Sequence, residues 1–489
     1  MITAVIFCDS ITSMKRPKKA HFIGICGAGM SAVALLLKED GWIVSGSDEG
    51  FYPPTSDFLT AHNLPCTTPY SPDNIPHHVN RIIIGKNAKL TPDSNAEVAA
   101  AFKRVSENND HLVVSFPDVL EELTAHTQNI VVAGSYGKST CAAILAHVLV
   151  SADKDPSYFI GAIPYGMPPA HRGGGDVFVI EGDEYPSSNW DTTSKFLHYN
   201  ATDVLLTSAT HDHINVFPTL KEYHAPFKTL LENIPNEGLL VASQDEPHAA
   251  SLFNSFKGKR VSYGLNTKAD YTASNIVYGE ETSFDLLKQG EHMVRLTTSL
   301  LGAHNVENIV GCSALLLERN LVTPEELKNG VESFHGIVRR LDKKSNNTRI
   351  PVYEGFGSSQ EKAHSAIAAM KLHFPHRNLI IIFEPHTFTW RNKGALGHYT
   401  HTFRDSVLML VYEPATQGAD THEQLTHAEI VDYLNTHGTT ARAIHSKEDG
   451  IALLQKHVTE DSLILLLTSG DLGGLIDASV AYVEKTFPN

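Results

Sequence analysis

The sequence predicts an α/β protein with several parallel sheets. Short β-branched or aliphatic runs alternate with helical stretches along the chain, a pattern typical of parallel strands covered by helices. Two runs lead directly into glycine-rich loops, and 489 residues are enough for about three domains. The predicted strands are Phe22–Cys26, Trp42–Ser45, Arg81–Ile84, His111–Ser115, Ile130–Ala133, Val177–Ile180, Val204–Thr207, Leu379–Phe383, Val407–Tyr412 and Leu463–Leu467.

Two boundaries divide this series of elements. One lies near Glu122–Gln128, before a new strand–loop–helix unit, and the other near His335–Arg339, after a predicted helix at Thr323–Phe334. Between them, Glu280–Leu300 alternates polar and apolar residues, which indicates a hairpin. We therefore expect domains at residues 1–126, 127–336 and 337–489.

Charge and cysteine content exclude several classes of protein. The chain has 39 Lys and Arg against 55 Asp and Glu, a net charge of −16 that repels phosphate backbones, so no nucleic-acid partner is expected. No apolar run approaches the ~18 residues of a membrane span, and the N-terminus does not resemble a signal peptide. We expect a cytoplasmic protein without membrane insertion. Its cysteines are spaced as free thiols: Cys8, Cys26, Cys66, Cys141 and Cys312.

The first glycine-rich loop follows the first predicted strand. It reads Gly27-Ala28-Gly29-Met30-Ser31-Ala32, which satisfies G-x-G-x-x-A, and Asp48 follows the next strand. Glycines and a helix N-terminus together accept a diphosphate, whichever molecule carries it. The pattern leaves a dinucleotide, a sugar nucleotide and a purely structural turn open. Asp48 is either a ribose partner or a turn residue at the strand end.

The second glycine-rich loop predicts a phosphate-binding loop. Ile130–Ala133 leads into Gly134-Ser135-Tyr136-Gly137-Lys138-Ser139-Thr140 and then a helix over Cys141–Val150. In that context, the Lys138 ammonium would contact the β- and γ-phosphates and the Ser139 hydroxyl would bind Mg²⁺. The spacing departs from G-x-x-x-x-G-K-[ST], because Val132 stands where that motif has its first glycine.

Acidic and imidazole side chains follow the next two strands. Glu181-Gly182-Asp183-Glu184 ends the strand Val177–Ile180, and carboxylates there suit Mg²⁺, although solvated turn residues would look the same. His211-Asp212-His213 follows Val204–Thr207 and offers one imidazole to the same centre. Because the chain has 27 histidines, the simpler interpretation is that this histidine has no role in the metal centre.

Together these motifs resemble the Mur ligase family of ATP-dependent enzymes, which join an amino acid or peptide to a UDP-linked muramic acid. The loop Ala133–Thr140 is similar to the family's short phosphate loop, Leu301–Asn308 to its adenine-binding helix start, and Arg339-Arg340-Leu341 to the arginine motif of its third domain. The resemblance implies a three-domain architecture. An N-terminal Rossmann-like domain would bind the UDP-sugar, a central P-loop ATPase-like domain would bind ATP, and a C-terminal Rossmann-like domain would follow.

The resemblance also implies roles for individual residues. Lys138 would contact the ATP phosphates, Ser139 and Glu181 would bind Mg²⁺, and His213 would belong to a metal-bound network. Arg340 would reach the γ-phosphate from the third domain, which makes Lys138, Glu181, His213 and Arg340 the predicted catalytic residues. The predicted ATP site comprises Gly134, Ser135, Tyr136, Gly137, Lys138, Ser139, Thr140, His304, Asn305, Asn308, Arg340 and Glu354. The predicted UDP-sugar site comprises Gly27, Ala28, Gly29, Met30, Ser31 and Asp48.

Within the family, the chain is most similar to the murein peptide ligases of peptidoglycan recycling. The similarity lies in Ile180–Tyr185, Ser194–Tyr199 and His21–Gly27. It implies that the tripeptide L-Ala-γ-D-Glu-meso-diaminopimelate is joined to UDP-N-acetylmuramate, with ATP and Mg²⁺, through an acyl phosphate. Arg391, which follows a predicted third-domain strand, is a candidate for the peptide carboxylate, although an exposed arginine is more often only solvated.

Two segments depart from the family pattern. Relatives carry Asp-Asp-Phe/Tyr-Ala/Gly-His-His-Pro where this chain reads Glu354-Gly355-Phe356-Gly357-Ser358-Ser359-Gln360, so the acidic ribose contact is shifted to Glu354 or lost. Thr210 replaces an acidic residue before Asp212-His213. These departures keep open a ligase fold that binds nucleotide without turnover. An L-alanine-adding ligase is the alternative within the family, and a nicotinamide-dependent oxidoreductase would explain Gly27–Ala32 and Asp48. The oxidoreductase would leave Lys138, Glu181 and Arg340 without a role.

Overall fold

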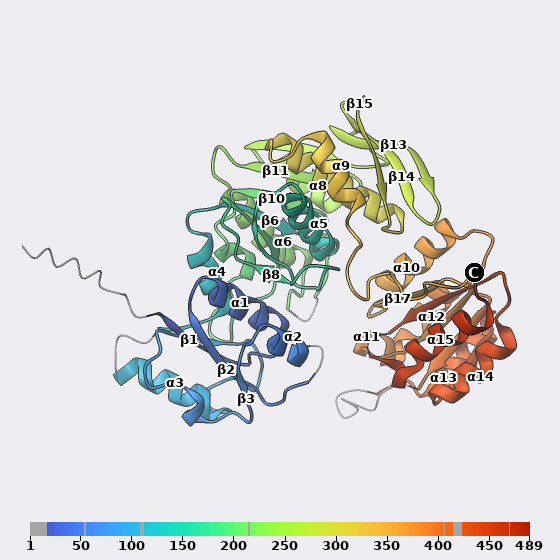
Figure 1. The fold of residues 1–489 in the computed structure, drawn as a ribbon, viewed down its shortest axis with the longest axis horizontal. Helices are drawn as coiled ribbons and strands as arrows, with labels where there is room; N and C mark the ends of the chain where they lie inside the picture. Colours follow the sequence, from blue (N-terminus) through green and yellow to red (C-terminus); the bar gives the residue numbers. More distant parts are fainter. Residues whose placement is uncertain are drawn as a thin grey trace, which may run out of the picture. The chain divides into compact units, whose positions relative to one another are not determined.

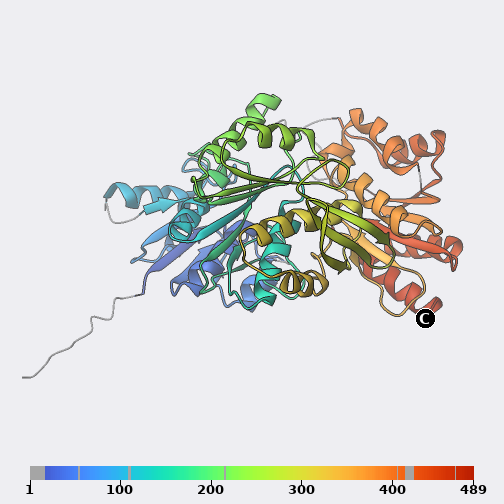
Figure 2. The same cartoon turned by 90° about the horizontal axis from the view of Figure 1, so that it is seen from above.

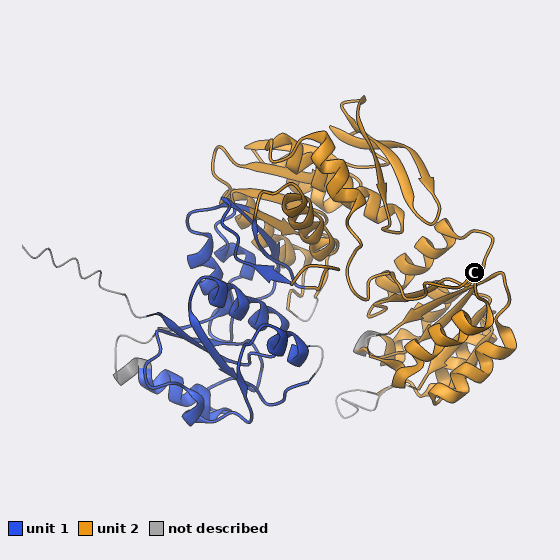
Figure 3. Cartoon of the chain, in the orientation of Figure 1, with its two compact units in different colours: residues 1–129, 156–161, 169–201 blue, residues 130–155, 162–168, 202–489 orange. Residues whose placement is uncertain are grey.

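The computed structural model describes residues 17–52, 55–107, 112–213, 216–404, 406–413, 423–468 and 470–489. The chain divides into two compact units, shown in Figure 3. Unit 1 comprises residues 1–129, 156–161 and 169–201, and unit 2 comprises residues 130–155, 162–168 and 202–489. The domain boundaries expected after residues 126 and 336 stay a prediction.

Unit 1 contains a five-stranded parallel sheet with the strand order β3-β2-β1-β4-β5. The order reverses direction at β1, which is where ligands bind in sheets of this kind. Its elements are β1 (Lys19–Ile23), α1 (Ala28–Glu39), β2 (Ile43–Ser47), α2 (Thr55–Ala61), β3 (Cys66–Thr67), η1 (Pro72–Asn74), β4 (Arg81–Ile84), α3 (Ala96–Glu107), β5 (Leu112–Val114) and α4 (Phe116–Thr124).

A second group of strands in unit 1 comes from its later segments. β9 (Val177–Gly182) pairs in parallel with β7 (Ser157–Phe159), which pairs antiparallel with β8 (Ala170–His171). After β9, the chain enters a loop that returns through η2 (Lys195–His198).

The central sheet of unit 2 has the order β15-β14-β13-β12-β11-β10-β6. Strands β6 to β13 are parallel along this series, and β13, β14 and β15 are antiparallel. Figure 2 shows helices on both faces of these strands. The elements are β6 (Gln128–Ala133), α5 (Lys138–Ser151), β10 (Asp203–Leu206), α6 (Leu220–Glu232), β11 (Leu239–Ser243), α7 (Pro247–Ser255), β12 (Lys259–Tyr263), β13 (Tyr271–Tyr278), β14 (Thr282–Lys288), β15 (Glu291–Thr298), α8 (Ala303–Glu318) and α9 (Pro324–Glu332).

The C-terminal part of unit 2 is coloured orange to red in Figure 1. Its six-stranded sheet has the order β16-β17-β21-β18-β19-β20 and is parallel apart from β16. Apolar side chains pack on both faces of it. Its elements are β16 (Asp342–Lys343), β17 (Val352–Gly355), α10 (Gln360–His373), β18 (Asn378–Phe383), α11 (Phe388–Arg391), η3 (Lys393–Ala395), α12 (Leu396–Phe403), β19 (Leu408–Tyr412), α13 (His427–Thr436), β20 (Ala441–Ile444), α14 (Lys447–His457), β21 (Ser462–Leu467), η5 (Leu472–Gly474) and α15 (Leu475–Thr486).

The three-part α/β architecture expected from the sequence is confirmed. The strand predicted at Arg81–Ile84 has those bounds, and the hairpin predicted within Glu280–Leu300 is β14 and β15. Most other predicted strands differ from the observed ones by one or two residues at an end, and the first strand differs more, because it ends at Ile23 and not at Cys26. Gly24 has a φ of +88°, a left-handed conformation that ends the extended run and that glycine adopts without strain.

Cys26, Cys66, Cys141 and Cys312 are free thiols, as expected, whereas Cys8 and His111 lie outside the described residues. Within the described ranges, no helix combines the length and the apolar composition that a bilayer crossing requires.

Candidate functional site

The phosphate loop lies between β6 and α5 in unit 2. Gly134 has a φ of +147° and Gly137 a φ of +84°. A Cβ at Gly134 would lie 2.2 Å from Thr207 Oγ1, so the loop accepts no side chain there. α5 begins at Lys138 without a side-chain cap, and Thr140 lies in its first turn. Close backbone packing at a helix N-terminus is the arrangement that binds phosphate groups.

Side chains after β10 hold the phosphate loop in place. Thr207 Oγ1 donates to Tyr136 O at 2.5 Å, and the Ser208 hydroxyl accepts from Tyr136 N at 3.0 Å. The Ser135 hydroxyl donates to Thr210 O at 2.5 Å. The predicted loop residues Ser135 and Tyr136 are therefore fixed through backbone contacts, which gives the loop a defined conformation.

Three cationic side chains gather at this loop. Lys138 Nζ donates to Gly134 O at 2.5 Å, and Arg340 Nη2 donates to Ser139 Oγ at 3.1 Å. The pKa of Lys362, at the start of α10, is lowered by desolvation and by the positive charges of Arg340 and Lys138, partly offset by Asp212. The structure thus brings the predicted residues Lys138, Ser139 and Arg340 together and adds Lys362, which the sequence analysis did not identify.

The N-terminal part of α8 lies against the phosphate loop. A Cβ at Gly137 would lie 3.0 Å from Asn308 Oδ1, so the Asn308 amide is a neighbour of the loop. Asn308 Nδ2 donates to Asn305 Oδ1 at 3.2 Å, and Asn305 Nδ2 donates to Leu301 O at 2.8 Å. The predicted adenine residue Asn305 is buried and ties the helix start together. Beside it, His304 Nδ1 lies 3.3 Å from Ser365 Oγ.

Arg339 and Arg340 have different surroundings although they are adjacent in sequence. Arg339 Nε donates to Glu354 Oε1 at 2.6 Å, and Lys344 Nζ lies 3.4 Å from Glu354 Oε2. The Glu354 side chain is only 4% exposed, so these two cations offset the cost of burying its carboxylate. The predicted ribose contact of Glu354 stays a prediction.

The segment after β10 places Asp212 and His213 at the surface. His213 has a φ of +55°, and its N–H donates to Asp212 Oδ1 at 2.7 Å. Thr210 donates from Oγ1 to Glu246 Oε1 at 3.1 Å. The buried Glu246 carboxylate also accepts from backbone N–H groups, so it caps α7.

Glu181 belongs to unit 1, whereas Lys138, Ser139 and His213 belong to unit 2. It stands at the carboxyl end of β9, and its Oε2 accepts from Gly161 N at 2.6 Å. A Cβ at Gly161 would lie 3.0 Å from the same oxygen, so glycine is what allows this close approach. The predicted metal-binding role of Glu181 stays a prediction.

Unit 1 has a cavity of about 640 Å³ at the switch point of its parallel sheet. A volume of this size accommodates a small-molecule ligand. Of the predicted UDP-sugar residues, Gly27, Met30 and Asp48 line the cavity, whereas Ala28, Gly29 and Ser31 do not. A Cβ at Gly29 would meet the Phe116 ring at 3.3 Å, so this glycine serves packing against α4.

Asp48 fixes the loops around the cavity. Its Oδ2 accepts from Cys26 N at 2.8 Å, and its Oδ1 accepts from the Tyr70 hydroxyl at 3.1 Å. Burial, followed by the charge of Asp48, raises the pKa of the Tyr70 phenol, so Tyr70 remains a proton donor. These contacts match the turn-residue alternative for Asp48, and a ribose contact stays a prediction.

Two lysines bring positive charge to unit 1 near this cavity. Lys86 lines the cavity, and its pKa is lowered by desolvation and by the charge of Lys195. Lys195 Nζ lies 2.5 Å from Asp183 Oδ2. Both Asp183 and Lys195 belong to the stretch that resembles murein peptide ligases. The sequence analysis missed Lys86, whose signal was its position two residues after the strand β4.

Arg391, the candidate for the peptide carboxylate, lies in α11. The residue is 7% exposed, so it is not a solvated surface arginine. The neighbouring Trp390 donates from Nε1 to Gly357 O at 2.7 Å, and Thr387 Oγ1 donates to Ser358 O at 2.8 Å. The loop after β18 therefore supports the altered segment that begins at Glu354.

Comparisons with known proteins agree with this arrangement. The chain matches the family models "Mur ligase family, catalytic domain" over residues 19–127 and "Mur ligase middle domain" over residues 132–316. It is 26% identical to the UDP-N-acetylmuramate–L-alanine ligase of Clostridium perfringens over 93% of this chain and 96% of that protein. The corresponding ligase of Lachnospira eligens is 27% identical over 93% of this chain and 96% of its own length.

Solved structures of Mur ligases share the fold. The UDP-N-acetylmuramate–alanine ligase of Thermotoga maritima has a TM-score of 0.76 at 23% identity, covering 96% of this chain and 99% of that one. The murein peptide ligase of Psychrobacter arcticus has a TM-score of 0.64 at 21% identity, covering 96% of this chain and 100% of that one. The chain therefore belongs to the Mur ligase family, whose members are ATP-dependent ligases that form amide bonds.

Proposed function

We propose that this ligase joins the tripeptide L-Ala-γ-D-Glu-meso-diaminopimelate to UDP-N-acetylmuramate with ATP. The observation that carries the ATP-dependent step is the contact of Arg340 with Ser139, because it brings a cation from the start of the third domain to the phosphate loop. A carboxylate is a poor electrophile, so transfer of the γ-phosphoryl group to it creates a better leaving group. The tripeptide amine then attacks the acyl carbon and releases phosphate.

Lys138 and Arg340 would supply the electrostatic part of phosphoryl transfer. The attacking carboxylate and the γ-phosphate are both negative, and preorganised cations offset their repulsion as charge spreads in the transition state. Lys362 adds a third positive charge at the same loop. In this chain it follows the segment Glu354–Gln360, which lacks the two histidines of its relatives.

The loop is also chemically suited to Mg²⁺. The Ser139 hydroxyl offers a neutral oxygen in the first turn of α5, the type of ligand that a nucleotide-bound magnesium ion takes. Ser139 and the predicted holder His213, both in unit 2, would hold such an ion, and when bound it would supply positive charge against the phosphate oxygens. The part of Glu181 in this set stays a prediction. Lys138 and Arg340 then orient the phosphoryl group by direct hydrogen bonds.

The unit 1 cavity is proposed to bind UDP-N-acetylmuramate. It lies at the carboxyl end of β1, beside the N-terminus of α1, which has no side-chain cap. Unpaired N–H groups and a positive dipole end favour a diphosphate there, and Lys86 adds positive charge to the lining.

The tripeptide is proposed as the amine because of the stretch from Ile180 to Tyr199. It resembles the murein peptide ligases, and its Asp183–Lys195 ion pair and Lys195 N–H to Tyr185 O bond of 2.9 Å give the loop a defined shape. L-alanine is a second candidate, because the Clostridium perfringens and Lachnospira eligens relatives are named as L-alanine ligases.

Turnover with each amine separately tests the proposal. ADP release is measured with ATP, Mg²⁺ and UDP-N-acetylmuramate, adding the tripeptide or L-alanine, and the product is identified by mass spectrometry. We expect turnover with the tripeptide and none in Lys138→Ala. Turnover with L-alanine alone would replace the tripeptide by the second candidate. Nucleotide binding without turnover on either amine would contradict both and favour the non-catalytic alternative.

A further inference from the structure

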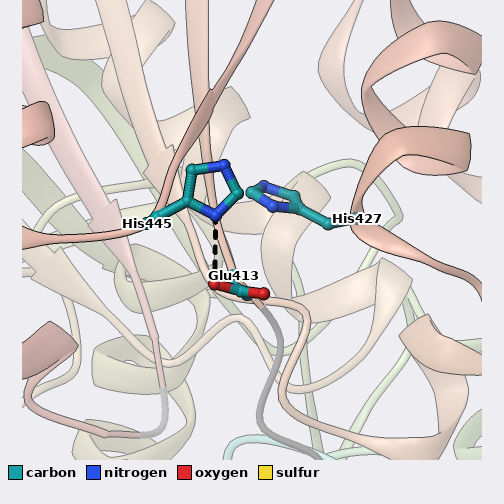
Figure 4. Close-up of side chains that lie close together, drawn as sticks. All are labelled: Glu413, His427 and His445. Carbon is teal, nitrogen blue, oxygen red and sulfur yellow. Dashed lines mark hydrogen bonds and ion pairs between the residues drawn. The ribbon is translucent and has the colours of Figure 1, made fainter.

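A cluster of two histidines and one glutamate lies in the third domain, among residues that the proposed ligase reaction does not use. Glu413 directly follows β19, His445 directly follows β20, and His427 begins α13. Because β19 and β20 are neighbouring parallel strands, their carboxyl ends meet at one edge of the sheet. Figure 4 shows the His427 ring pointing toward His445 and Glu413.

The three side chains are close enough to share one ion. Each offers a ligand atom, and these atoms lie within 4.8 Å of one another. His445 Nδ1 lies 3.0 Å from Glu413 Oε2, and the two imidazole rings have centroids 4.9 Å apart at 76°. Two ligands of a tetrahedral ion with bonds of about 2.0–2.1 Å lie roughly 3.3 Å apart, so small shifts would complete the geometry.

His427 is already oriented as a metal-binding histidine. Its Nε2 lies 2.8 Å from Val411 O, and since a carbonyl only accepts, Nε2 carries the proton. That tautomer leaves a lone pair on Nδ1. A backbone carbonyl that fixes the second ring nitrogen is the usual support of a zinc-bound histidine.

The other ring nitrogen of His427, Nδ1, forms no hydrogen bond with the described residues. The atom is nevertheless buried. Buried polar atoms are almost always paired, so an unpaired one calls for a specific explanation. A surface ion pair accounts for Glu413 and His445, whose side chains are 56% and 60% exposed, but it leaves this nitrogen unexplained.

We propose that Glu413, His427 and His445 bind a Zn²⁺ ion. Two imidazole nitrogens and one carboxylate oxygen form a donor set that zinc takes readily and that Mg²⁺, which prefers oxygen ligands, does not. Three protein ligands leave the fourth tetrahedral position for water. The ion would link the ends of β19 and β20 to α13 and so stabilise this edge of the third domain.

A second group with similar composition lacks the feature that carries the proposal. Asp118, Glu121 and His198 in unit 1 also lie close together. Both His198 nitrogens are engaged, however, with Nδ1 at 3.0 Å from Glu121 and Nε2 at 3.1 Å from Asp191. His198 therefore supplies a matched control.

The test is metal binding by the full chain after treatment with a chelator. Zn²⁺ is titrated in competition with a chromophoric chelator, and Co²⁺, which reports tetrahedral ligation by visible absorption, is titrated separately. We expect one tight site per chain and a Zn²⁺-dependent rise in Tm. Loss of an outer-shell partner alone weakens metal binding about 10–100-fold. His427→Ala and His445→Ala remove ligands that contact the ion, so each should weaken Zn²⁺ binding by at least that much. His198→Ala should not change it.

Several outcomes would overturn the proposal. They are absence of a tight zinc site in the wild-type chain, unchanged affinity in both histidine variants, or an equal loss in His198→Ala. Glu413→Gln, which keeps the size of the side chain, replaces the histidine variants if circular dichroism shows that they do not fold. These readouts need no substrate, so the result does not depend on the proposed ligase function.

Discussion

Adjacent residues of this chain carry different functions. Arg339 and Arg340 stand side by side in one motif, yet Arg339 donates to the buried Glu354 while Arg340 donates to Ser139 in the phosphate loop. Arg339 has a φ of +66°, which turns the backbone between the two side chains. The pair thus combines a structural arginine with one suited to phosphoryl transfer.

This difference gives a prediction for two neighbouring substitutions. Arg340→Ala should lower kcat on the order of 10³-fold, the effect of losing an arginine that stabilises the transferring phosphoryl group, with little change in Tm. Arg339→Ala should lower Tm, because it leaves the Glu354 carboxylate buried with one cation less. Steady-state kinetics and thermal unfolding of both variants check this. Equal phenotypes would contradict the division of roles.

At the scale of elements, a buried polar network joins the parts of the first sheet. Glu97 on α3 accepts from His21 on β1 at 2.9 Å, from Ser47 on β2 at 2.7 Å and from the backbone N–H of Ser71 at 2.8 Å. Burial by itself would raise the pKa of Glu97, but these hydrogen bonds, with one from Asn74, outweigh it and the pKa is lowered.

The sign of this shift predicts how stability depends on pH. A carboxyl whose pKa is lower in the folded state stabilises the fold fully at pH values above its unfolded pKa. That stabilisation is lost as the pH falls through the folded pKa. For Glu97 the loss should begin at about pH 5 and continue downward. Glu97→Gln should remove this contribution and cost about 1.5–3 kcal/mol near pH 7, the range for buried hydrogen bonds to a charged group. Urea unfolding at several pH values measures it. Glu448→Gln, at an exposed glutamate, is the control, and an equal loss there would refute the assignment.

At the scale of the whole molecule, the proposed ligands belong to different units. The cavity for the UDP-sugar is lined by unit 1, and the phosphate loop with Arg340 belongs to unit 2. Hydrogen exchange should therefore respond to each ligand in a different part of the chain. UDP-N-acetylmuramate should protect residues 24–30 and 85–90, and a non-hydrolysable ATP analogue should protect residues 134–140 and 303–308. Protection of residues 24–30 by the ATP analogue would contradict this division.

Local sequence was sufficient for much of the fold. The bounds of β4 follow from a short run of one arginine and three isoleucines. The phosphate loop could also be predicted, because its glycines and Lys138 lie within one short segment of the chain. The first strand shows the limit of this reasoning. Apolar residues continue past Ile23, but the positive φ of Gly24 ends the strand, and a hydrophobic pattern contains no information on backbone angles.

The sequence by itself determined the α/β class, the two glycine-rich loops and the family resemblance, because each depends on residues close together in the chain. Only the tertiary structure decided which distant side chains meet. It placed Arg340 on Ser139, Lys362 within range of the charges of Arg340 and Lys138, and His427 beside His445. It also buried Arg391, for which the sequence had left a solvated surface position open. These contacts depend on strand order and loop conformation, and the spacing of residues along the chain specifies neither of them.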